Sequence, residues 1–172
     1  SYYKATCAPE LEVATGALSA AEAAFWSEVY TQGLGEFFFR NDIATPTVTF
    51  PAGGSPPPAA PALPSQPDRV LLLVGGGKDS VVAREVLRHA GVDVTLISLS
   101  TAPWIRRSAA AMGDEHLVIG RALDRRLFAL NDAGALNGHV PISAIIAAAT
   151  RLVALIGGFD AVISANEYSA SF

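Results

Sequence analysis

The chain has 172 residues, of which 51% are apolar and only 16% are charged, so it has room for one core-bearing domain and a small appendage. Its net charge of −4 argues against a broad phosphate-binding surface, and we expect no nucleic-acid partner. The single cysteine, Cys7, excludes a disulfide framework or a cysteine-based zinc site within the chain. Its first residues do not resemble a signal peptide, and no apolar run reaches the ~20 residues that a membrane span needs. We therefore expect a cytoplasmic protein with no membrane partner.

Residues 1–45 are predicted to form a small α+β segment. Ser19 and Glu22 have the spacing of a capping box, and Gly33 suits the end of the helix that follows. The stretch EFFFRNDI is expected to form a short strand. Residues 46–68 hold eight of the eleven prolines, which neither continue a helix nor donate to a sheet. They predict an extended linker or surface loop.

The remainder, residues 69–172, contains four apolar runs that predict strands: VLLLV, VTLISLS, EHLVIG and DAVISA. Continuous runs of this kind are typical of parallel strands that are buried on both faces. They alternate with segments of helical pattern. The alternation predicts an α/β fold in which a parallel sheet has helices on both faces and right-handed crossovers.

Three helices are predicted between these strands. The first follows three glycines and has an apolar stripe formed by Val82, Val86, Leu87 and Ala90. The second begins at Pro103 and ends near Gly113. The third, PISAIIAAATRLVALIGG, is apolar nearly all round. The two tryptophans, Trp26 and Trp104, are assigned to the core or to an interface.

The stretch GGGKDS, Gly75–Ser80, separates the first strand from the first of these helices. Glycines let backbone N–H groups approach a ligand, and a helix N-terminus adds unpaired N–H groups and partial positive charge. Lys78 adds a full charge, and the Ser80 hydroxyl adds a donor. The pattern predicts a phosphate site, with a purely structural tight turn as the alternative. Neither the Walker A nor the dinucleotide spacing fits, because Asp79 follows Lys78 and Ser80 stands at the third glycine position.

The six residues Gly75, Gly76, Gly77, Lys78, Asp79 and Ser80 resemble the Ser-Gly-Gly-x-Asp-Ser loop of the N-type ATP pyrophosphatases, with Gly75 in place of the first serine. The resemblance implies a PP-loop core of the HUP type with ATP and Mg²⁺ as cofactors. Enzymes of this group cleave ATP between its α- and β-phosphates and transfer AMP to a substrate oxygen. By this resemblance Gly75–Ser80 bind the nucleotide and Asp79 lies at the magnesium ion.

Two further motifs narrow the resemblance. They are Asn-Gly-His-Val-Pro at residues 137–141 and Asn-Glu-Tyr-Ser-Ala at residues 166–170. Together with GGGKDS they resemble the ATP-dependent epimerases of UDP-N-acetylmuramoyl-L-alanyl-L-glutamate, in which arginine usually stands at the position of Tyr168. The resemblance implies that Asn166 and Ser169 contact the nucleotide. Because members of that family are longer, residues 69–172 are expected to be a PP-loop domain that is incomplete at its C-terminus.

The implied reaction inverts the terminal L-Glu of UDP-MurNAc-L-Ala-L-Glu through adenylation of its carboxylate, with release of AMP and pyrophosphate, in peptidoglycan precursor synthesis. With one cysteine the chain cannot supply a thiol to each face of the α-carbon, so we name Glu167, His139 and Lys78 as catalytic candidates. Glu167 binding magnesium and His139 orienting the helix start are open alternatives. So are another adenylating enzyme (tRNA-modifying, nitrile-forming or amidating), a non-catalytic ATP-binding module, and a homo-oligomeric state.

Overall fold

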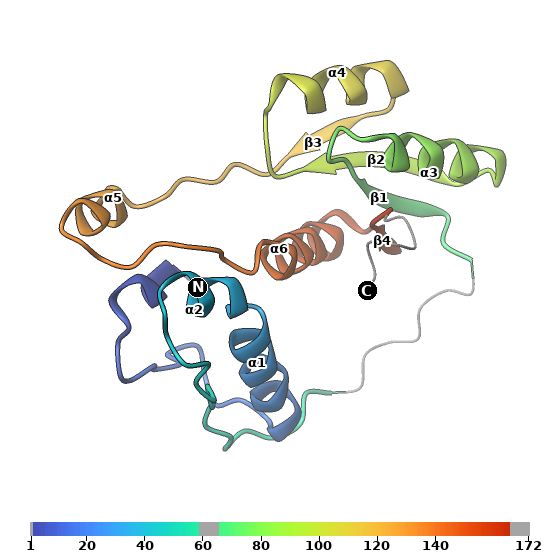
Figure 1. Ribbon diagram of the computed structural model, residues 1–172. Helices are drawn as coiled ribbons and strands as arrows, with labels where there is room; N and C mark the ends of the chain where they lie inside the picture. Colours follow the sequence, from blue (N-terminus) through green and yellow to red (C-terminus); the bar gives the residue numbers. More distant parts are fainter. Residues whose placement is uncertain (1, 59–65, 166–172) are drawn as a thin grey trace. The chain divides into compact units, whose positions relative to one another are not determined.

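The computed structural model describes residues 2–58 and 66–165, and contacts divide the chain into two compact units (Figure 1). The helical unit comprises Ser1–Ala60 and Leu123–Ala144, and the sheet unit comprises Pro61–Ala122 and Ile145–Phe172. Residues 123–144 thus group with the N-terminal segment. The domain boundaries expected from the sequence stay predictions.

The sheet unit is built on four parallel strands in the order β3-β2-β1-β4. This confirms the predicted parallel α/β architecture. Each strand lies where an apolar run predicted it, and the three helices lie between them. The strands are β1 (Arg69–Leu73), β2 (Asp93–Ser98), β3 (His116–Val118) and β4 (Ala161–Ile163), and the helices are α3 (Lys78–His89), α4 (Pro103–Met112) and α6 (Ile142–Gly157).

Helices cover both faces of this sheet. Successive residues of a strand point to opposite sides, so neighbouring residues of β1 belong to different cores. Val70 and Leu72 of β1 are fully buried in a core that includes Ile105 of α4 and, at its margin, residues of α3. Leu71 lies in a second core with Ala154 of α6. Figure 1 shows α3 and α4 on one side of the strands and α6 on the other.

The predicted apolar stripe of α3 is wrong in its choice of face. Ala83 and Leu87 pack against the core, whereas Val82 and Val86 are 61% and 63% exposed. Ser80 is buried, and its hydroxyl donates to the carbonyl oxygen of Gly77 at 3.0 Å. Ser80, Ala83 and Leu87 follow helical spacing, so they share the face of α3 that meets the sheet.

The helical unit contains η1 (Tyr2–Thr6), α1 (Ala20–Gln32), α2 (Gly35–Arg40) and α5 (Arg125–Asp132). The capping box at the start of α1 is confirmed: Ser19 and Glu22 exchange hydrogen bonds, and Gly33 caps the C-terminus. Helix α5 was not predicted. Residues 46–58 and 66–68 have no helix or strand beyond an isolated bridge between Ala52 and Leu18.

The predicted strand EFFFRNDI is wrong, because residues 36–40 of this stretch lie in α2 and the rest forms no strand. Leu34, Phe37 and Phe38 have helical spacing and form one buried cluster with Tyr30 and Leu136 at its margin. The N–H of Asn41 and its side-chain amide both donate to the carbonyl oxygen of Phe37, which ends the helix. Tertiary burial of the aromatic rings overrides the strand preference that three successive phenylalanines have in isolation.

Candidate functional site

The glycine turn, Gly75–Gly77, joins β1 to α3 as predicted. The N–H of Val74, just after β1, still donates to Ile97 of β2 at 2.9 Å. Gly76 then adopts φ +87°, and Gly77 is the N-cap of α3. No side chain caps this helix. Its first-turn N–H groups are therefore available to an anion.

Two of the three glycines border open space. A Cβ atom built on Gly75 or Gly77 would have no other heavy atom within 4 Å beyond its chain neighbours. One built on Gly76 would lie 2.7 Å from Cδ1 of Trp104, and the positive φ of Gly76 disfavours any side chain there. The middle glycine is therefore required for packing, and its neighbours leave room for a ligand.

The side chains that follow the glycines differ in their surroundings. Lys78 is exposed, Asp79 is half-buried in the first turn of α3, and Ser80 is buried. The Ser80 proton is used within the turn by Gly77. The Ser80 oxygen retains lone pairs that accept, so the positive groups at this turn are the backbone N–H groups and the Lys78 ammonium.

The sheet topology marks the carboxyl end of β1 as a switch point. From β1 the chain winds through β2 to β3 on one side, and it then returns to form β4 on the opposite side of β1. Leu72 of β1 is paired with Ile163 of β4. Ligands of open α/β sheets bind outside the carboxyl ends of strands at such a reversal. The glycine turn follows β1 at this point, and Ser164 follows β4.

Asn166, Glu167 and Ser169 lie outside the described residues, so their predicted roles stay predictions. The Asn-Gly-His-Val-Pro motif, residues 137–141, lies in the helical unit, whereas the glycine turn lies in the sheet unit. Among the predicted site residues that the structure describes, Gly75–Ser80 lie together in the sheet unit, and His139 belongs to the helical unit.

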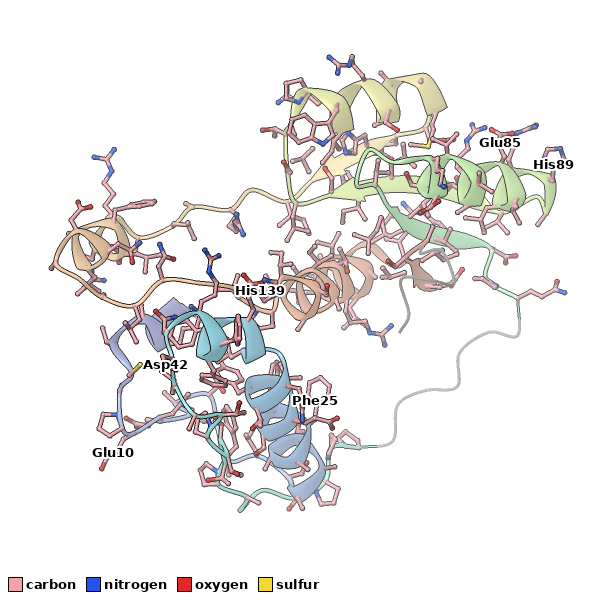
Figure 2. All side chains as sticks on the ribbon, in the orientation of Figure 1. Glu10, Phe25, Asp42, Glu85, His89 and His139 are labelled. Atoms are coloured by element: carbon pink, nitrogen blue, oxygen red, sulfur yellow. The ribbon has the colours of Figure 1, made fainter. Side chains whose placement is uncertain are left out.

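His139 lies beside Glu36 of α2, with 3.5 Å between Nδ1 and Oε2 (Figure 2). The carbonyl oxygen of Asn137 accepts from the side-chain amide of Asn41 at 2.8 Å. Gly138 has φ +147°, and a Cβ there would lie 3.2 Å from the Phe37 ring. The Asn-Gly-His motif therefore packs on α2. Sequence reasoning missed Glu36 as the partner of His139, since the two are distant in the chain.

A second polar pair lies at the carboxyl end of β2. Ser98 is buried, and its hydroxyl donates to the carbonyl oxygen of Ser100 at 2.9 Å. Nε2 of His116 lies 3.0 Å from the same hydroxyl oxygen. Since the Ser98 proton is directed to Ser100, the donor in this contact is assigned to Nε2. Burial lowers the pKa of His116, and the positive charge of Arg106 lowers it further.

Two hollows are found in the described surface, and no glycine of the turn lines either of them. One of about 370 Å³ runs beside β4 and α6 and is lined by residues that include Leu73, Thr150 and Ser164. The other, of about 970 Å³, lies in the helical unit beside Glu10 and Glu12. Among residues 2–58 and 66–165, no three His, Cys, Asp or Glu side chains gather as a metal site. Asp79 as a magnesium ligand stays a prediction.

A family model described as the MurL N-terminal domain matches residues 1–172. This chain belongs to the MurL N-terminal domain family. The chain is also 42% identical over 173 residues, 100% of its length, to a UDP-N-acetyl-alpha-D-muramoyl-L-alanyl-L-glutamate epimerase of Xanthomonas oryzae pv. oryzae. A protein of the same name from Micromonospora sp. is 40% identical over 99% of the chain, and one from Salinispora tropica is 39% identical over 99%.

These matches confirm the resemblance to the epimerase family. The chain covers 38% of the Xanthomonas and Micromonospora proteins and 37% of the Salinispora protein. It therefore spans little more than a third of the curated relatives that it matches. In the part of the chain that the structure describes, no helix combines the length and apolar character needed to cross a membrane.

Proposed function

We propose that this chain is the nucleotide-binding N-terminal part of a cytoplasmic, ATP-dependent epimerase that inverts the terminal L-Glu of UDP-N-acetylmuramoyl-L-alanyl-L-glutamate. One observation carries the proposal: Gly75–Ser80 join a buried parallel strand to a helix at the switch point of the sheet. That arrangement is what a PP-loop core of the HUP type requires. The names of the relatives supply the substrate and the reaction class.

The turn has the groups that a nucleotide phosphate needs. The uncapped first turn of α3 offers N–H donors, and Lys78 offers a cation that neutralises phosphate charge. Gly75 and Gly77 leave open space for the close approach of phosphate oxygens. The Asp79 carboxylate is a hard oxygen ligand of the kind that Mg²⁺ prefers. Bound Mg²⁺ would shield the charge of the departing pyrophosphate.

ATP acts as a co-substrate in the proposed reaction. A carboxylate oxygen of the terminal glutamate attacks the α-phosphorus, the bond from that phosphorus to the bridging oxygen breaks, and pyrophosphate leaves. The acyl group that results lacks the carboxylate charge, so less repulsion opposes removal of the α-proton. A base removes this proton from one face, and an acid returns a proton to the other. Water then cleaves the anhydride to give the D-glutamyl product and AMP.

Proton transfer needs a base and an acid on opposite faces of the α-carbon. Within this chain we assign these roles to His139 and Glu167, with Lys78 acting on the phosphates and as a further candidate. Glu36 lies beside His139, with 3.5 Å between Oε2 and Nδ1, and is the side chain that contacts the imidazole from α2.

The test uses the full-length protein with ATP, Mg²⁺ and the UDP-linked L-Ala-L-Glu precursor in deuterated water. Deuterium at the glutamate α-carbon, formed together with AMP and the D-epimer, is the expected result. AMP release without deuterium would instead indicate an adenylating enzyme with other downstream chemistry. ATP binding without AMP release would indicate a non-catalytic binding module.

A further inference from the structure

Trp104 occupies an unusual position for a tryptophan, since it is not in the core. It is the second residue of α4, and 58% of it is exposed. Its Cδ1 atom lies against Gly76, since a Cβ atom built on that glycine would be 2.7 Å from it. Of the two assignments given to Trp104, core or interface, this exposure rules out the core. The exposed ring therefore lies beside the candidate ligand site.

The edge of the indole that touches the turn is its polar edge. Cδ1 is bonded directly to Nε1, whose N–H is the only hydrogen-bond donor of the side chain. Among the residues that the structure describes, this N–H has no protein acceptor, and the ring stacks on no other aromatic ring. The donor thus lies one bond away from the atom that contacts Gly76.

The surroundings of this donor favour an anion as its acceptor. Gly75 and Gly77, on either side of Gly76, border open space, and the first turn of α3 has no capping side chain. The helix terminus contributes partial positive charge there. A neutral N–H donor forms its stronger hydrogen bonds with charged acceptors.

We infer that Trp104 is a contact residue for the ligand of the glycine turn and donates a hydrogen bond from Nε1 to a phosphate oxygen. The inference rests on the proposed function, which places the phosphates of ATP in this turn. It assigns to Trp104 a part in phosphate binding that the GGGKDS motif alone does not include. The contact of the ring with Gly76 also disfavours a side chain at that position.

The experiment compares Trp104→Phe with Trp26→Phe in the full-length protein, using ATP and inorganic tripolyphosphate as ligands. Phenylalanine keeps an aromatic ring but removes the N–H. Trp26, on α1 in the helical unit, serves as the matched control. We expect both ligands to change the tryptophan fluorescence of the wild type and of Trp26→Phe but not of Trp104→Phe. We also expect Trp104→Phe to weaken the binding of both ligands by roughly tenfold.

Three outcomes would overturn the inference, and they are distinguishable. If Trp104→Phe binds both ligands as tightly as the wild type and keeps the fluorescence response, Trp104 does not contact the ligand, and the proposed function stands. If only ATP gives the response, the contact is with the nucleoside and not with a phosphate. If the wild type binds neither ligand, the proposed function fails, and the inference fails with it.

A second measurement, made on the wild-type sequence, does not depend on whether the variant folds correctly. The protein is labelled with 5-fluorotryptophan, and the ¹⁹F resonance that Trp104→Phe lacks is assigned to Trp104. Tripolyphosphate should shift that resonance and leave the Trp26 resonance in place. An unmoved Trp104 resonance at saturating tripolyphosphate would overturn the inference.

Discussion

Arg84 of α3 forms two parallel hydrogen bonds with Asp114, from Nε to Oδ2 at 2.6 Å and from Nη2 to Oδ1 at 3.0 Å. The two side chains are only 16% and 19% exposed. The pair ties the helix that begins at the glycine turn to the segment that follows α4. Hydrogen bonding to Asp114, and then to Glu85, raises the pKa of the Arg84 guanidinium.

Arg84→Met is expected to lower the melting temperature by several degrees, because it leaves the mostly buried Asp114 carboxylate without its two donors. Arg126→Met is the matched control: its pair with Asp124 has the same 2.6 Å separation but is 87% and 56% exposed. Exposed pairs contribute little, so this variant should melt close to the wild type. Equal melting temperatures for the two variants would contradict the assigned role of Arg84.

Gly76→Ala should destabilise the protein by about 1–3 kcal/mol, because alanine would adopt a positive φ and meet the Trp104 ring. Gly77→Ala, where φ is −91° and the space is open, should fold with nearly wild-type stability. Chemical denaturation of the two variants measures the difference. Similar losses in both would show that the close approach of Trp104 does not restrict the turn.

Lys78→Met should weaken ATP binding by roughly ten- to a hundredfold, because it removes a charge-assisted contact to phosphate. Arg88→Met removes a cation from the last turn of the same helix, and its affinity for ATP should be unchanged. Calorimetric titration of the full-length variants checks both values. An equal loss in both would mean that general electrostatic attraction, and not the turn, binds the nucleotide.

His116 is expected to make stability depend on pH. Burial lowers the pKa of His116 from its ordinary 6.5, so the folded state favours the neutral ring. The contribution of His116 to the free energy of unfolding is complete above pH 6.5. It is lost as the pH falls through the lowered pKa of His116 in the folded state. His116→Gln keeps an N–H donor for Ser98 and should flatten the fall in melting temperature over that range.

The control for this experiment is His89→Gln at the exposed end of α3 (Figure 2). It should retain the wild-type dependence of melting temperature on pH. A flattened curve in His89→Gln, or an unchanged curve in His116→Gln, would assign the dependence to another group.

His139→Gln should slow deuterium incorporation at the glutamate α-carbon by at least tenfold while leaving ATP affinity unchanged, because the glycine turn is intact. Glu36→Gln should slow it less, since it alters the residue that contacts His139 and leaves the imidazole itself in place. If His139→Gln incorporates deuterium at the wild-type rate, His139 does not transfer the proton and only orients the start of α6.

The sequence by itself determined the local features of this chain. The capping box of Ser19 and Glu22, the proline that opens α4 and the left-handed Gly113 that closes it were all predictable. So were the positions of the four strands and the turn of Gly75–Gly77 before α3. These features depend on hydrogen bonds, backbone angles and apolar runs within a few residues of one another, which a sequence displays directly.

Only the tertiary structure decided which partners these elements have. It placed β4 beside β1, turned Val82 and Val86 outward, and made a helix of the phenylalanine-rich stretch. It also set the Trp104 ring against Gly76 and paired His139 with Glu36. Such contacts join residues far apart in the chain. Which of these contacts form depends on which surfaces are buried against each other, and this cannot be read from a local sequence pattern.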